Sequence, residues 1–154
     1  MMKILTLTGT RPELIKLSLV IKKLDKHPAV DHVFVYSNQN FDESLRDIFL
    51  DELGLRKPDY TFKEVPHTSF LSNAFLEFDK VLDKEKPDKV LVLGDTNSAL
   101  LVILANKRGI PIYHMEGGNR SYDLRVPEET NRRIIDIVST YNLPHTAQSK
   151  ENLI

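Results

Sequence analysis

The sequence of 154 residues contains no cysteine. This absence excludes a disulfide framework, a thiolate nucleophile and a cysteine-based zinc site, and it is compatible with the cytosol. No stretch approaches the roughly 20 apolar residues that a membrane helix needs. The apolar run at residues 4–7 is too short for a signal peptide, and Gly9 and Arg11 soon interrupt it. We therefore expect a cytoplasmic protein without a membrane partner.

An excess of charge of one sign is also missing. The 21 lysines and arginines are balanced by 22 aspartates and glutamates, which gives a formal net charge of −1. Basic residues at 22–26 and 132–133 are interleaved with acidic and apolar residues, as on a solvated helix face. We therefore expect no nucleic-acid partner. The length fits one domain, which we predict to span residues 1–154.

Short apolar runs alternate along the chain with longer segments of helical periodicity. This alternation is typical of βαβ units, so the predicted fold class is α/β, a Rossmann-like parallel sheet with helices on both faces. Strands are predicted at residues 3–8, 32–36, 58–63, 90–93, 110–113 and 143–146. Helices are predicted to begin near Thr10, Asp42, Ser69, Thr96, Pro127 and Ser149.

Two of these helices carry clear local signals. Thr10 and Glu13 have the spacing of a capping box, so the first helix should start directly after Gly9. In the second helix, which Gly54 ends, the periodicity predicts an inward face. Its members are Leu45, Ile48, Phe49 and Leu53.

Parallel α/β sheets bind ligands beyond the carboxyl ends of their strands, where loops and helix N-termini converge. Four polar clusters are predicted at that edge, with a Pro-Glu-Glu segment at 127–129 just downstream. The clusters are residues 9–13, 37–40, 94–96 and 114–120. From these clusters, and from Lys16 about one helical turn after Arg11, we expect the substrate contacts. They are Arg11, Lys16, Gln39, Asn40, His114 and Arg120.

Arg11, at a predicted helix N-terminus, could hold a phosphate with its guanidinium fork and the helix dipole, and Lys16 could add a second cation. Taken alone, Arg11 is equally well explained as a surface arginine, and Lys16 is better explained as a solvated helix residue. The sequence has no GxGxxG and no Walker A motif, so neither a dinucleotide site nor an ATP site of those kinds is predicted.

Carboxylates follow the predicted strands at several of these ends. Asp95 follows a buried strand and a glycine, where it could move a proton or simply cap a helix. Capping explains Glu116 less well, whereas Glu128 and Glu129 could both complement a helix dipole. Three carboxylates on adjacent strand ends beside one basic pocket could together transfer a proton next to a bound phosphate ester.

His114 ends an apolar strand, a place where a histidine is more often a satisfied core or loop residue than a ligand. The sequence has no second histidine at a suitable spacing. We therefore predict no metal site.

At these clusters the sequence resembles the non-hydrolysing UDP-N-acetylglucosamine 2-epimerase family. The match spans nearly the whole chain in order, and the joint occurrence of its segments is highly specific. The segments are GTRPELIKL at 9–17, NQNFD at 38–42, LGDTNSALL at 93–101, HMEGGNRSYD at 114–123 and VPEETNRR at 126–133.

The resemblance implies the N-terminal lobe of a GT-B-like fold, in which two Rossmann-like domains close over a UDP-sugar, usually in a homodimer. The second lobe supplies most uridine and diphosphate contacts and a catalytic-site histidine. We expect that this lobe is absent from the chain and that the chain alone is inactive or nearly so.

The reaction implied by the resemblance removes the proton at C2 of the sugar, eliminates UDP to give a glycal, and re-adds UDP with the proton on the opposite face. It needs no nicotinamide or metal. Carried over by position, Asp95, Glu116 and Glu128 are the acid/base and charge-stabilising carboxylates. Arg11 and Lys16 address the diphosphate.

The sequence departs from the family at two turns. It has Ser-Asn-Gln-Asn at 37–40 where Thr-Gly-Gln-His or Thr-Gly-Gln-Asn is common, and Glu-Gly-Gly at 116–118 where Glu-Ala-Gly is common. The segment from Glu116 to Glu128 is also short. It looks more like the branch that acts on modified UDP-HexNAc sugars for capsule or O-antigen, such as UDP-2-acetamido-2,6-dideoxy-talose or UDP-diacetamido-glucuronate. The substrate therefore stays open.

Two other functions fit the same features. One is a lobe of a GT-B glycosyltransferase, which shares the fold and a nucleotide-sugar crevice. The other is a non-catalytic module that binds sugar nucleotides.

Overall fold

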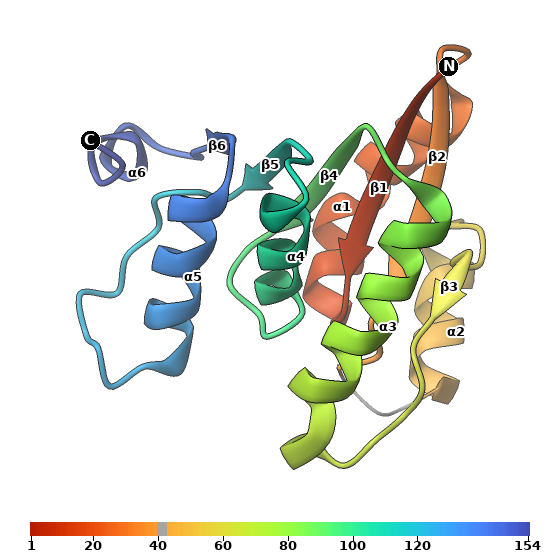
Figure 1. The fold of residues 1–154 in the computed structure, drawn as a ribbon, viewed down its shortest axis with the longest axis horizontal. Helices are drawn as coiled ribbons and strands as arrows, with labels where there is room; N and C mark the ends of the chain where they lie inside the picture. The colour runs from red at the N-terminus through yellow and green to blue at the C-terminus, as the bar shows by residue number, and fades with distance from the viewer. Residues whose placement is uncertain (40–42) are drawn as a thin grey trace.

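The computed structural model describes residues 1–39 and 43–154, with the backbone alone for residues 43–46. Its centre is a parallel sheet of six strands in the order β3-β2-β1-β4-β5-β6 (Figure 1). The strands are β1 Met2–Thr8, β2 Val30–Tyr36, β3 Tyr60–Thr61, β4 Lys89–Leu93, β5 Ile112–Met115 and β6 Tyr141–Leu143. This order confirms the predicted Rossmann-like parallel sheet.

Helices cover both faces of the sheet. One face carries α1 and α2, and the other carries α3, α4 and α5 (Figure 1). The helices are α1 Arg11–Lys26, α2 Glu43–Glu52, α3 Phe70–Glu85, α4 Val102–Lys107, α5 Pro127–Val138 and α6 Ala147–Glu151. Short 3-10 turns, η1 His67–Ser69 and η2 Ala99–Leu101, precede α3 and α4.

The start of α1 confirms the predicted capping box. Thr10 is the N-cap, and its backbone N–H donates to the Glu13 carboxylate at 2.7 Å. Pro12 in the first turn lacks only an N–H that the helix would leave unpaired. The chain therefore turns from strand to helix within Gly9 and Thr10, which places the N-terminus of α1 at the carboxyl edge of the sheet.

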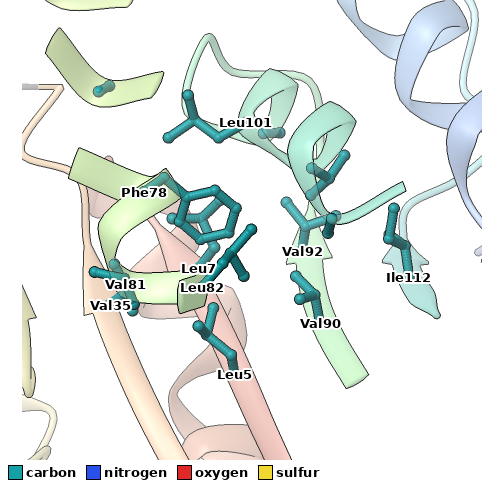
Figure 2. Packing of buried hydrophobic residues seen from close by; sticks show 14 of the residues in the cluster. Leu5, Leu7, Val35, Phe78, Val81, Leu82, Val90, Val92, Leu101 and Ile112 are labelled. Carbon is teal, nitrogen blue, oxygen red and sulfur yellow. The ribbon is translucent and has the colours of Figure 1, made fainter. Parts of the chain in front are cut away.

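The sheet separates two apolar clusters because alternate side chains of a strand point to opposite faces. In β4, Val90 and Val92 face the cluster under α3 and α4, whereas Leu91 and Leu93 face the cluster under α1. Figure 2 shows the first cluster, with Phe78 reaching from α3 toward the sheet. Phe78 is fully buried.

Some predicted details were wrong. Ile48, assigned to the inward face of α2, is 50% exposed, and Leu50 is buried instead. The last strand ends at Leu143, where the prediction had it begin, and α6 starts at Ala147 rather than Ser149. Short segments carry too few apolar positions to fix a helical phase or a strand boundary.

Within the part of the chain that the structure describes, no helix is both long enough and apolar enough to span a bilayer.

Candidate active site

The turns after β4 and β5 lie against each other at the carboxyl edge of the sheet. The N–H of Gly94 donates to the carbonyl of Met115 at 3.0 Å. Gly94 has φ +78°, and a Cβ built on it would lie 3.6 Å from Oε2 of Glu116. The left-handed backbone thus favours glycine here, and the turn that carries Asp95 runs beside the Glu116 carboxylate.

Glu116 is paired with Lys16 of α1. The Nζ of Lys16 lies 2.6 Å from Oε1 of Glu116, whose side chain is only 12% exposed. Glu116 also has φ +67°, a left-handed conformation that is uncommon for a residue with a Cβ. Two residues predicted for the site therefore meet, and one of them is held in a strained backbone conformation of the kind that clusters at functional sites.

Asp95 is held by α5. The Nε of Arg132 donates to Oδ2 of Asp95 at 3.0 Å, and the side-chain amide of Asn131 donates to the Asp95 carbonyl at 3.0 Å. The helical segment after this turn begins at Ala99 with Ser98 as its N-cap. The alternative interpretation of Asp95 as a helix cap is therefore wrong, and its carboxylate faces an arginine.

The two neighbouring glutamates of α5, Glu128 and Glu129, have different surroundings. Glu129 is fully buried and accepts from the Ser121 N–H at 2.8 Å and from Arg132 and Arg133 at 2.9 Å each. Burial alone would raise the pKa of Glu129, but these donors lower it to about 2. Glu128 is exposed and has no ion-pair partner among the described residues. Glu129 thus acts as a structural anchor, and Glu128 stays available to a ligand.

Arg11 is the first residue of α1 and is exposed. Its guanidinium carbon lies 5.4 Å from the centroid of the Phe49 ring, a cation–π distance. The helix N-terminus and this guanidinium together favour an anion at the sheet edge.

The loop after β2 contacts the turn after β4. Oε1 of Gln39 accepts from the N–H of Ser98 at 2.9 Å and from its hydroxyl at 2.8 Å. Gln39 therefore helps to hold the neighbouring turn. Asn40, also predicted as a substrate contact, lies outside the described residues.

His114 and Arg120 belong to a buried network around Asp136. His114 is fully buried, with Nε2 2.8 Å from the Gly94 carbonyl and Nδ1 3.0 Å from Asp136. Arg120 donates to Asp136 at 2.6 Å, and the Gly118 N–H lies 3.2 Å from the same carboxylate. The structure thus places both predicted residues under the turn that carries Glu116 and gives each of them a protein partner.

The sequence did not point to Asp136, because its only local signal is a buried position on α5. Burial alone would raise the pKa of Asp136, but the donors His114 and Arg120 lower it. The carboxylate is therefore charged, and it fixes the loop between β5 and α5.

Both departures from the family motifs have a structural explanation. Asn38 adopts φ +57°, and asparagine tolerates this left-handed conformation better than most residues with a Cβ. A Cβ on Gly117 would lie 2.8 Å from the Cβ of Asn142, so the alanine common in the family does not fit beside this asparagine. Asn142 in turn donates to the Asp136 carbonyl at 3.0 Å.

Of the residues predicted for the site, Lys16 and Glu116 form an ion pair beside the turn of Asp95. Arg11 and Glu128 are exposed in the first turns of α1 and α5. Two of the carboxylates are paired with cations, and the third is open. Among the residues that the structure describes, no group of three or more metal-ligating side chains is placed to hold a metal ion.

Comparisons with known proteins agree on fold and family. The model of the UDP-N-acetylglucosamine 2-epimerase family matches residues 22–154. The chain is 40% identical to the UDP-2,3-diacetamido-2,3-dideoxy-D-glucuronate 2-epimerase of Pseudomonas aeruginosa, over 99% of this chain and 44% of that protein. The structure of the Methanocaldococcus jannaschii UDP-GlcNAc 2-epimerase in complex with UDP-GlcNAc and UDP is 41% identical. It superposes with a TM-score of 0.91 over 99% of this chain and 42% of that chain.

A lipopolysaccharide outer core galactosyltransferase superposes with a TM-score of 0.65 at 16% identity, covering 99% of this chain and 42% of that one, and it shares the fold alone. The sheet order and these neighbours define the class: a Rossmann-like lobe of the GT-B architecture. Within that class, the chain belongs to the UDP-N-acetylglucosamine 2-epimerase family and matches its N-terminal domain. It spans between 42% and 44% of the length of the relatives described above.

Proposed function

We propose that this chain forms the N-terminal half of a UDP-HexNAc 2-epimerase. The reaction removes the proton at C2, breaks the C1–O bond to release UDP, and leaves a glycal. UDP then adds back at C1 while a proton returns to the opposite face of C2. Atoms and charge balance without a nicotinamide or a metal ion.

The observation that carries the proposal is the contact between Lys16 and Glu116. It joins a cation suited to a diphosphate with a carboxylate suited to proton transfer, at 2.6 Å. Asp95 lies on the adjacent turn, so two proton-transfer groups border the place where a bound phosphate ester would lie. A UDP-sugar that engages Lys16 through its diphosphate would bring its sugar ring next to these carboxylates.

The proposed roles follow from the exposure of each group. Arg11 and Lys16 bind the diphosphate, and Glu128, Asp95 and Glu116 transfer protons or stabilise charge at the sugar. Gln39, His114 and Arg120 act mainly by holding the turns, since each has protein partners. The second lobe, which the relatives' length implies, would close over the UDP moiety.

The substrate class is a UDP-HexNAc, either UDP-GlcNAc or a modified derivative. The solved relatives include an enzyme in complex with UDP-GlcNAc, and the P. aeruginosa relative is named for a diacetamido sugar. The short segment between Glu116 and Glu128 favours a modified sugar of the kind that supplies surface polysaccharides. We expect the full-length enzyme to be a homodimer in the cytoplasm.

A panel of UDP-HexNAc sugars tests the proposal. The 154-residue chain and a version that spans the full length of the relatives are incubated with each sugar, and the C2 epimer is followed by proton NMR. We expect epimer from at least one sugar in the long version and none, or nearly none, from the short chain. Sugar transfer to an acceptor without epimer would instead support a glycosyltransferase, and binding without turnover would support a non-catalytic module.

A further inference from the structure

Glu13 is a buried carboxylate directly behind the site, and the proposed reaction does not use it. Its side chain is 2% exposed. Oε2 accepts from the N–H groups of Gly9 and Thr10 at 2.8 and 2.7 Å and from the Thr10 hydroxyl at 2.9 Å. Oε1 accepts from the hydroxyl of Thr96 at 2.9 Å. The two oxygens therefore bind two different turns.

Helix capping explains only half of this arrangement. A capping-box glutamate accepts from the N-cap backbone, as Oε2 does here. The bond from Thr96 has no part in a cap, because Thr96 is 83 residues away and directly follows Asp95. The second oxygen thus connects the start of α1 to the turn after β4.

The burial of a carboxylate is costly unless donors surround it. Burial raises the pKa of Glu13, and its hydrogen bonds from the two turns oppose that effect. All of its hydrogen-bond partners can donate, so each turn is held in the position that satisfies the carboxylate.

The two turns are also packed in direct contact. A Cβ built on Gly9 would lie 1.8 Å from Oγ of Ser98, so no side chain fits between them. The Ser98 hydroxyl lies 2.6 Å from that of Ser37. A displacement of one turn is therefore transmitted to the other.

We infer that Glu13 is a positioning residue that fixes the turn carrying Asp95 against the turn that leads into Arg11. The inference rests on the proposed function, which assigns Arg11 to the diphosphate and Asp95 to the sugar. Glu13 sets the distance between the guanidinium that binds the diphosphate and the carboxylate that acts at the sugar. It touches neither substrate nor reacting atoms.

Three substitutions test this role in the full-length version. Glu13→Ala removes both connections, and Glu13→Gln keeps the shape, since an amide can accept from the first turn and donate to the Thr96 oxygen. Thr96→Val is nearly isosteric and removes the bond between Glu13 and the Asp95 turn. It also removes a 3.3 Å bond from the Ala99 N–H to the Thr96 hydroxyl, but that N–H keeps the Thr96 carbonyl as its acceptor at 3.0 Å. Val81→Ala, in the apolar cluster under α3, is the control for a general loss of stability.

For Thr96→Val we expect kcat to fall about 10- to 100-fold, because small misplacements of catalytic groups reduce rates strongly. KM and the affinity for UDP should stay near the wild-type values, whereas the melting temperature should fall, because Oε1 of the buried Glu13 loses its donor. Glu13→Ala should lower kcat and weaken UDP binding together, and Glu13→Gln should restore most of both. Val81→Ala should lower the melting temperature without changing kcat.

A measurement on the 154-residue chain separates this inference from the proposed function. Amide NMR signals of residues 94–97 should shift in Glu13→Ala, and those of Gly9 and Thr10 should shift in Thr96→Val, with or without enzymatic activity. If the wild-type long version forms no epimer while these signals shift, the proposed function fails and the connection stands. If Thr96→Val changes neither kcat nor the signals of Gly9 and Thr10, Glu13 is a helix cap only and the inference is overturned.

Discussion

Lys16 and Glu116 form an ion pair with 2.6 Å between Nζ and Oε1, although 100 residues separate them in the sequence. Lys16 lies on α1 and Glu116 directly follows β5, so the pair exists only because the sheet brings both elements to one edge. Lys16 is half-exposed, and in the proposed function it exchanges this partner for a diphosphate. The sheet edge therefore holds this cation and this carboxylate together.

Loss of Lys16 should weaken UDP binding. A hydrogen bond to a charged group contributes about 1.5–3 kcal/mol, so Lys16→Ala should raise the dissociation constant of UDP about 10- to 100-fold. Isothermal titration of the full-length version measures this. Lys23→Ala, an exposed lysine of the last turn of the same helix, is the matched control and should leave UDP binding unchanged. Equal effects of the two variants would show that only net charge matters.

Arg132 connects Asp95 to Glu129, so its loss should harm both activity and stability. Arg132→Ala leaves a buried carboxylate with fewer partners, and we expect the free energy of unfolding to fall by about 3 kcal/mol. The control is Arg133→Ala, which removes a partner of Glu129 but none of Asp95. Arg133→Ala should retain kcat, whereas Arg132→Ala should lower it. A similar kcat for both variants would contradict a role of Arg132 in holding Asp95.

Glu129 should make stability depend on pH in the acid range. Its pKa in the folded chain is about 2, below the ordinary value of 4.5. The carboxylate therefore stabilises the fold fully above pH 4.5, and this contribution is lost as the pH falls from 4.5 toward 2. Urea unfolding of the wild type and of Glu129→Gln across this range measures the effect. The difference between the two should be largest near neutral pH and should shrink toward pH 2; a constant difference would contradict it.

Gly117 and Asn142 should be coupled, since a Cβ on Gly117 would meet the Cβ of Asn142 at 2.8 Å. Gly117→Ala should lower the free energy of unfolding by about 1–3 kcal/mol, as overpacking does. In an Asn142→Gly background, where that Cβ is absent, the same change should cost clearly less. A double-mutant cycle of melting curves decides this, and strict additivity would rule out the coupling.

The sequence predicted the main features of the fold because its apolar runs and helical segments alternate regularly. The predicted strands at 90–93 and 110–113 placed Asp95 and Glu116 at the same edge, and in the structure the two strands end at Leu93 and Met115. The phase of α2 failed at Ile48, which is exposed, because a short helix has few positions from which to judge its inward face.

The supporting network could not be predicted, because it depends on contacts between distant elements. The capping role of Glu13 follows from local spacing, but its bond from Thr96 spans 83 residues. Asp136 likewise holds His114, which lies 22 residues earlier on β5, and Arg120 of the following loop. Local patterns identify the residues at strand ends and carry no information on which buried side chains hold them.

The most direct test of the proposed reaction is NMR in deuterated water. The full-length version is incubated with the UDP-HexNAc that it epimerises best, and deuterium at C2 is measured in the remaining substrate and in the product. Because the C2 proton is removed and a proton from solvent returns, we predict deuterium at C2 in the product. In Glu116→Gln or Asp95→Asn, deuterium should no longer be incorporated at C2. Epimer that keeps its original C2 proton would contradict the account.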